Sequence, residues 1–478
     1  MADESLAARL ARLTPQERAQ LLRNASARAA TIPRRPAGQN ELPLSPAQQR
    51  MWFLEQLQPG SYHSYDFTRL TGPLDVARLE AAFREIIRRH EALRTSFVSV
   101  DGVPRQIVHD EVPFAMGQVT TADPQTFADE EALRPFDLTR APLVRVTLIK
   151  LKDDEHLLLL VLHHIISDGW SLGVIDQELR TLYAGVRLPE LPVQFGDVVL
   201  WQQSRLGDGV EWWKQALAGV PDVLDLPADH PRPAVQSFRG ARYLHTASPA
   251  LIAELNGLAQ RERVTLFMIL TAAFETLLYR HTGQSAFAIG TPVANRTTPE
   301  TEALVGLFIN TVALRADLGG DPPFRELLGR VRETALEAFA HQEVPFDRVV
   351  DALALPRNAN RTPLYQTMIV LGAGPAGSYA PLDGGVERTA YNPRSATARF
   401  DLTLSMAIDE TGLVCLFDYA ADLFEEATIA NFARRFEMLL RGAVADVMTP
   451  VSRLPLMDAE ERRVMLSRAD GEASVPLS

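Results

Sequence analysis

The chain of 478 residues contains one cysteine, Cys415, and little that would place it in a membrane. A single thiol excludes a disulfide framework and a thiol cluster, and it suits a reducing cytoplasm. The apolar run at residues 157–162 is too short to span a bilayer, and residues 1–40 lack the apolar core of a signal peptide. We therefore expect a cytoplasmic protein with no membrane partner.

Net positive charge is also lacking, since the formal net charge is −12. A balance of this sign argues against nucleic acid as a general partner. The net charge does not indicate any particular partner. An acidic partner would need local basic patches on this chain.

Length and composition predict a globular protein of two lobes. Hydrophobic residues make up 46% and charged residues 23% of the chain, which is ordinary for a folded protein. At 478 residues the chain exceeds the usual size of one core. Four prolines within residues 221–233 mark the boundary, so we expect lobes over 41–220 and 221–455.

The two ends of the chain are expected to lie outside these lobes. Residues 1–40 predict a helical linker or docking segment, and 456–478 a further linker. Residues 1–36 carry seven arginines against three carboxylates. A solvated linker helix and a docking surface both remain open for this segment.

The chemistry concentrates at the end of a predicted strand. Residues 157–162 predict a buried strand, and apolar residues at helical spacing over 170–180 predict a helix. Residues 163–169 therefore form a strand-to-helix crossover. Crossovers of this kind commonly display reactive side chains.

The crossover contains His163, His164, Asp168 and Gly169. Adjacent strand residues face opposite sides, so one histidine enters a cavity and the other packs. We assign the reactive side to His164, which adjoins the bend, because imidazole takes or shares a proton near neutral pH. The same geometry argues against a metal site. Asp168 is expected to pair with an arginine, and Gly169 to permit a sharp backbone turn.

The heptad has the form HHxxxDG and resembles the signature of the condensation domains of non-ribosomal peptide synthetases. Further blocks resemble other motifs of this family in the family's order. They are residues 44–54, 89–97, 289–296 with 306–311, 341–347 and 360–364. The resemblance extends over residues 42–455.

This resemblance implies an α/β fold of two chloramphenicol-acetyltransferase-like lobes that form a V-shaped pseudo-dimer around a central tunnel. It implies formation of an amide bond between a donor thioester and the amine of an acceptor aminoacyl thioester. The chain would need no cofactor of its own, because 4'-phosphopantetheine on carrier domains holds the substrates. Donor and acceptor carrier domains, and an adenylation domain after residues 456–478, are the implied partners.

The resemblance is to members that use an L-configured donor or to starter members that use fatty acyl-CoA, and both remain open. If Met1 is the native start, the donor comes from another chain or from acyl-CoA. A non-catalytic module that binds carrier proteins is the alternative function. His164 would act as a base or as a positioning group.

The resemblance also suggests supporting residues. Arg89 is expected to hold Asp168, with Arg145, on the preceding strand, as the alternative. Trp201, Asn310 and His341 are expected to line the tunnel or bridge the lobes.

Overall fold

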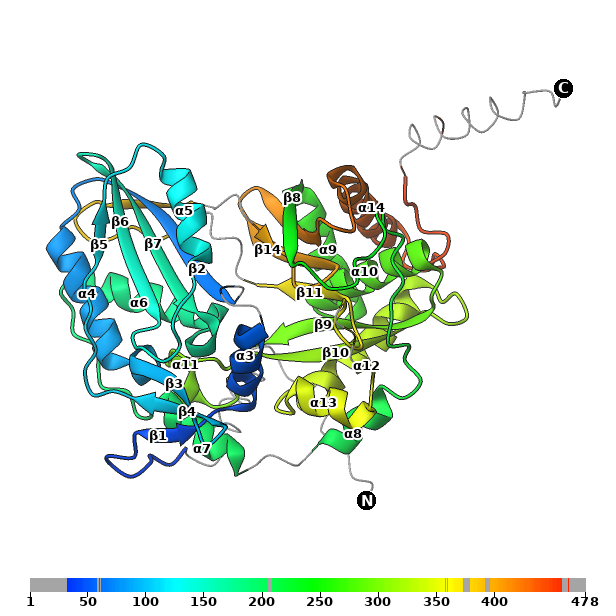
Figure 1. The fold of residues 1–478 in the computed structure, drawn as a ribbon. Helices are drawn as coiled ribbons and strands as arrows, with labels where there is room; N and C mark the ends of the chain where they lie inside the picture. Colours follow the sequence, from blue (N-terminus) through cyan, green and yellow to red (C-terminus); the bar gives the residue numbers. More distant parts are fainter. Residues whose placement is uncertain are drawn as a thin grey trace, which may run out of the picture.

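The computed structural model contains two lobes (Figure 1), each built on a large mixed sheet. It describes residues 32–57, 60, 62–204, 209–356, 358, 360–372, 379–391, 396–457 and 463. The helix expected near the start of the chain falls within residues 1–31, outside the described residues, as does most of the expected linker at 456–478. In the described ranges we find no helix with the length and apolar character needed to cross a membrane.

The first lobe holds a sheet in the order β12-β2-β7-β6-β5 and a smaller sheet in the order β1-β4-β3. Its strands are β1 (Glu41–Pro43), β2 (His63–Thr71), β3 (Thr95–Val100), β4 (Val103–Val108), β5 (Gly117–Val119), β6 (Val144–Lys152), β7 (Glu155–His163) and β12 (Glu387–Ala390). Its helices are α3 (Pro46–Leu57), α4 (Val76–Arg89), η1 (Glu91–Arg94), α5 (Pro124–Leu133), η2 (His164–Ile166), α6 (Gly169–Tyr183) and α7 (Phe195–Gln203).

Strand β7 is the central element of the first lobe, as its apolar run predicts. Leu158, Leu160 and Leu162 face a core that includes α4 and α6. The alternating residues Leu157 and Leu159 face a second, smaller core that includes α5. Because both faces of β7 are covered, its sequence is continuously apolar and ends abruptly at the histidines.

The second lobe holds a sheet in the order β10-β9-β11-β14-β15-β8-β13. Its strands are β8 (Arg239–Ala247), β9 (Ala286–Val293), β10 (Asn310–Asp317), β11 (Thr367–Leu371), β13 (Ala396–Thr397), β14 (Leu402–Asp409) and β15 (Gly412–Ala420). Its helices are α8 (Val210–Ala216), α9 (Pro249–Glu262), α10 (Leu266–Thr282), α12 (Phe324–Ala340), α13 (Phe346–Leu353) and α14 (Glu426–Ala445); the short α11 (Pro299–Glu302) lies between β9 and β10 in the chain.

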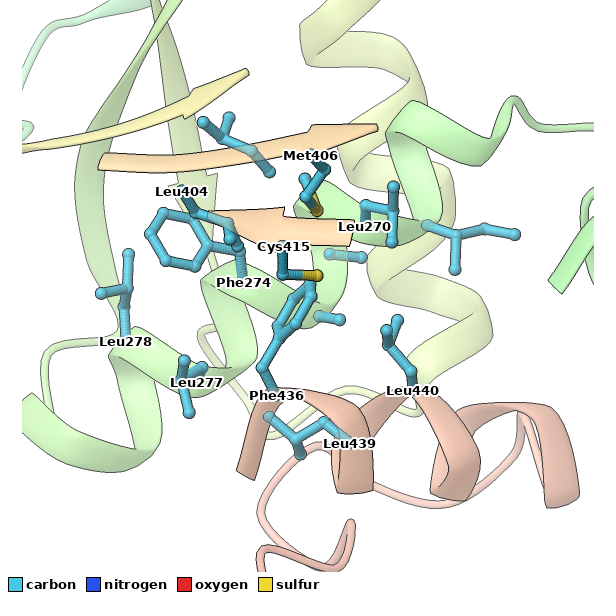
Figure 2. Packing of buried hydrophobic residues seen from close by; sticks show 14 of the residues in the cluster. Leu270, Phe274, Leu277, Leu278, Leu404, Met406, Cys415, Phe436, Leu439 and Leu440 are labelled. Atoms are coloured by element: carbon cyan, nitrogen blue, oxygen red, sulfur yellow. The ribbon is translucent and has the colours of Figure 1, made fainter. Parts of the chain in front are cut away.

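Helices α9, α10, α12 and α14 pack on one face of this sheet, and α8 and α13 on the other. Figure 2 shows the larger core, where Phe274 and Phe436 surround Cys415 of β15. Burial raises the pKa of the Cys415 thiol to about 12. The one thiol is therefore a core side chain without thiolate reactivity.

Packing differs from the expected boundaries at two places. Trp213 of α8 precedes residue 221 yet packs in the core of the second lobe. Residues 32–40, expected as linker, lie against the first lobe: Ile32 is buried, and Arg35 contacts Glu91 at 2.6 Å and Asp197 at 2.9 Å. These partly buried ion pairs hold the segment against the first lobe.

The second half of the chain returns to the first lobe twice. Leu304, Val305, Leu307 and Phe308 join the first lobe's core. Strand β12 then pairs with β2, with Glu387 opposite Thr71. The two lobes are therefore tied at two separate points.

Glu275 on α10 makes the unfolding free energy of the protein depend on pH. Its side chain is buried with Oε2 unpartnered among the described residues, and burial raises its pKa well above the ordinary value. The fold therefore favours the protonated Glu275 carboxyl. The stability that this preference contributes is fully present below about pH 4, the pKa of the unfolded chain, and is lost as the pH rises through the folded-state pKa.

We therefore expect Glu275→Gln, which stays neutral, to gain stability over the native chain as the pH rises. The difference in unfolding free energy should grow by at most about 1.4 kcal/mol per pH unit. Urea unfolding at several pH values between about 5 and 8 measures it. Parallel stability profiles for the two proteins would contradict the assignment.

Candidate active site

A cavity of about 1140 Å³ lies between the lobes and receives side chains from both. Its wall includes Ser45, Arg50, Met51, Tyr62, His164, Trp201, Asn310, Phe346, Tyr365 and Arg399. Helix α3 lies between the lobes in Figure 1 and contributes Arg50 and Met51 to the wall. A space of this size accommodates an extended small-molecule substrate.

The two histidines of the heptad separate as predicted. His163, the last residue of β7, is fully buried; its Nδ1 accepts a hydrogen bond from the Ile165 N–H at 3.0 Å, and its Nε2 lies 3.2 Å from a Glu55 carboxylate oxygen. His164 begins η2 and lines the cavity. His163 therefore supports the turn, and His164 is the histidine that a substrate can reach.

The contacts of His164 fix its protonation pattern. Its Nδ1 lies 2.5 Å from the carbonyl oxygen of Ser167. A carbonyl oxygen only accepts, so Nδ1 carries the proton and donates it, and Nε2 of the neutral ring keeps a lone pair. Burial, followed by the positive charge of Arg399, lowers the pKa of His164 to about 4. The ring is therefore neutral near pH 7 and able to accept a proton at Nε2.

Asp168 joins the heptad to the second half of the chain. One carboxylate oxygen accepts hydrogen bonds from the Ser171 N–H at 2.8 Å and the Ser171 hydroxyl at 2.7 Å, which caps α6. The other accepts from the N–H groups of Phe308 at 3.0 Å and Ile309 at 3.2 Å. Asp168 is 1% exposed, so its charge needs these donors.

The arginine beside Asp168 is Arg296, so the expectation of Arg89 or Arg145 was wrong. Arg296 Nη2 lies 3.3 Å from Asp168, and its guanidinium stacks 3.9 Å from the centroid of the Phe308 ring. Arg89 instead donates to Glu178 at 2.8 Å, and Arg145 to Glu131 at 2.5 Å. Arg89 and Arg145 are therefore each already paired with a carboxylate other than Asp168.

Gly169 needs no special backbone conformation, contrary to expectation. It is the first residue of α6, and it is not among the glycines with positive φ. A Cβ built on it would meet no described atom within 4 Å. The turn is held by the Asp168 cap and not by glycine.

Of the three residues expected at the tunnel or between the lobes, two line the cavity. Trp201 and Asn310 lie in its wall, and Asn310 Nδ2 donates to the carbonyl oxygens of Gln342 at 2.8 Å and Val344 at 2.6 Å. His341 is not among the lining residues. Its ring stacks on Trp212 at 4.0 Å, within the second lobe, so neither expected role fits it.

Sequence reasoning missed Arg399, Tyr62 and Arg296. Arg296 closes a block that matched the family pattern at residues 289–296, so a signal for it was present. The cavity's use of Tyr62 and Arg399 depends on the two lobes meeting, which no local pattern encodes. We find no group of three or more His, Cys, Asp or Glu suited to a metal ion in the ranges the structure describes.

The chain is similar to known proteins over most of its length. The family model described as "Condensation domain" matches residues 38–466. A linear gramicidin synthase protein of Brevibacillus parabrevis is 42% identical over 457 residues, which cover 91% of this chain and 6% of that protein. Surfactin synthase subunit 1 of Bacillus subtilis (strain 168) is 38% identical over 434 residues, 88% of this chain and 12% of that protein. The chain therefore spans only a small part of the length of these relatives.

Two solved structures are similar over most of the chain. The X-domain from teicoplanin biosynthesis has 29% identity and a TM-score of 0.81, covering 90% of this chain and 100% of that one. A four-domain non-ribosomal peptide synthetase bound to AMP and glycine has 22% identity and a TM-score of 0.80, covering 88% and 34%. The second match concerns the fold alone.

Proposed function

The chain belongs to the condensation-domain family of non-ribosomal peptide synthetases, and we propose that it joins a donor acyl or aminoacyl thioester to the amine of an acceptor aminoacyl thioester. The observation that carries this proposal is the neutral imidazole of His164, whose Nδ1 proton is donated to Ser167 and whose ring faces a cavity between the lobes. We infer that the acceptor and donor are carried on 4'-phosphopantetheine of carrier domains, or that the donor is an acyl-CoA.

The reaction that fits this site is thioester aminolysis. The acceptor nitrogen forms a bond to the donor carbonyl carbon, and the carbonyl π pair moves onto oxygen. The nitrogen gives a proton to His164 Nε2, directly or as the adduct collapses. The oxygen pair then re-forms the carbonyl while the C–S bond breaks, and the thiolate takes the proton that His164 Nε2 received, which restores the neutral ring. Thioesters are already activated, so holding both substrates in one cavity contributes much of the acceleration.

Asp168 has a supporting role in this proposal. Its hydrogen bonds to Phe308 and Ile309 come from the segment that crosses from the second half of the chain. The α6 start that it caps immediately follows the His164 turn. We infer that Asp168 keeps His164 in place and does not itself meet the substrates.

The alternative, a module that binds carrier proteins without catalysis, makes a different prediction. Such a module does not require an accessible, unprotonated imidazole in its cavity. The lining of the cavity by His164 therefore favours the enzyme.

The test incubates the protein with a carrier-bound aminoacyl acceptor and a panel of donors, both acyl-CoA and peptidyl-carrier thioesters. Mass spectrometry should detect an acceptor carrier with the added acyl mass. The same acceptor with an acetylated amine serves as the control and should give none. Carrier binding without product from any donor would favour the non-catalytic alternative, and the productive donor would distinguish a starter from an elongation role.

A further inference from the structure

Arg399 brings a positive charge from the second lobe to the site on the first. It precedes β14 and lines the same cavity as His164. Its guanidinium carbon lies 4.6 Å from the centroid of the Tyr62 ring. The Tyr62 carbonyl accepts a hydrogen bond from the His164 N–H at 2.8 Å. Tyr62 therefore joins the His164 backbone to the Arg399 side chain.

No carboxylate of the described residues lies within ion-pair distance of Arg399, whereas three other arginines with little exposed surface each have one. Arg296 has Asp168 at 3.3 Å, Arg89 has Glu178 at 2.8 Å, and Arg388 has Asp176 at 2.5 Å. The charged group that bears on Arg399 is another cation, Arg50, which itself has Asp347 at 3.8 Å.

An arginine stays protonated in proteins, so this side chain remains a cation inside the cavity. A charge that is partly removed from water and has no partner lowers stability. Its five N–H donors in a planar fork are suited to an oxygen that carries negative charge. The arrangement is therefore incomplete until a substrate oxygen supplies that charge.

We propose that Arg399 is a further catalytic residue, which donates hydrogen bonds to the donor carbonyl oxygen as that oxygen becomes negative in the tetrahedral adduct. This inference rests on the proposed function and adds the group that stabilises the oxyanion. His164 receives the proton from nitrogen, and Arg399 balances the charge that forms on oxygen. Both groups act on one adduct from the two lobes.

The proposal predicts a loss in turnover and not in binding. Arg399→Gln should lower kcat about a hundredfold, the typical effect of removing one oxyanion donor, with KM within about threefold of the native value. Arg399→Lys keeps the charge without the fork and should recover part of the rate. Because the cation near His164 is removed in the Gln variant, the pKa of His164 should rise and the acid limb of the kcat profile should move to higher pH.

Stability separates this role from a structural one. Arg399→Gln removes a cation without a carboxylate partner, so its melting temperature should equal or exceed that of the native chain. Arg242 is the matched control, since it lies within electrostatic range of Tyr65, as Arg399 does, but is paired with Asp418 at 2.7 Å. Arg242→Gln should keep native kcat.

Three results would overturn the inference. They are a kcat within threefold of native for Arg399→Gln, a loss confined to the KM of donors with acidic side chains, and equal losses for Arg399→Gln and Arg242→Gln. Should the Gln variant fail to fold, Arg399→Lys decides, because a folded Lys variant with native kcat also overturns it. If the native protein condenses no substrate, the proposed function itself is wrong, which is a distinguishable outcome.

Discussion

Replacing His164 with alanine should lower amide formation at least about a hundredfold while the protein stays folded. The imidazole lines the cavity, and its ring makes one hydrogen bond to the nearby Ser167 carbonyl, so few structural contacts are lost. What disappears is the acceptor for the amine proton. Single-turnover product formation, read by mass spectrometry with carrier-bound substrates, measures the effect.

The matched control is the neighbouring histidine. His163 is buried and accepts a hydrogen bond from Ile165, so His163→Ala should lower the melting temperature as well as the rate. His164→Ala should lower the rate alone. Turnover close to native in a folded His164→Ala protein would reject the catalytic role assigned to this residue.

The pH dependence of the native protein carries a sign that follows from the same geometry. The pKa of His164 is lowered to about 4, so the neutral, proton-accepting ring predominates above that pH and is lost below it. Between about pH 6 and 8 any rise in rate should therefore follow the acceptor amine, whose ordinary pKa is roughly 8. A midpoint near the usual histidine pKa that vanishes in His164→Ala would contradict this environment.

Replacing Asp168 with alanine should destabilise the protein by about 3–5 kcal/mol, the usual cost of breaking a buried ion pair from one side. Arg296 would lose its carboxylate while its own burial is unchanged, and the N–H groups of Phe308 and Ile309 would lose their acceptor. Burial already lowers the pKa of Arg296, which reflects the poor solvation of its charge. Chemical denaturation measures the difference in unfolding free energy.

A double-mutant cycle distinguishes the pair from its surroundings. Arg296→Met should partly rescue Asp168→Ala, because the unpaired cation is then absent. Asp168→Asn keeps an acceptor for Ser171 and should lose less stability than alanine. If the denaturation midpoint of Asp168→Ala equals that of the native chain, the Asp168 carboxylate does not hold the two halves of the chain together.

Local patterns were sufficient where the sequence is strongly apolar or carries a dense motif. The run at 157–162 predicted β7, and the helical spacing after it predicted α6. Strand β8 was missed because only its last residue, Ala247, is buried and its other residues are exposed or half-buried; its pairing with β15 defines it. A short stretch of sequence does not reveal which distant strand it will pair with.

In the site, too, local features were predicted from the sequence and long-range contacts were not. The separation of His163 and His164 was predicted from the period of a strand, although His164 begins η2 directly after β7 ends. Both signals are local. The partner of Asp168 lies 128 residues away on the chain, and two nearer arginines of equal chemistry were available to choose from. Long-range partner choice depends on which carboxylate each arginine already faces, and that information arises only on folding.

Strand β12 has a practical consequence for hybrids made with related condensation domains. It comes from the second half of the chain but completes the edge of the first sheet, and Arg388 on it contacts Asp176 of α6 at 2.5 Å. A chimera joined near residue 221 would import a foreign edge strand together with the new second lobe. Its β2 edge and Asp176 would then have to match residues selected in another protein. Breakpoints that keep β2, α6 and β12 from one parent should yield more folded hybrids.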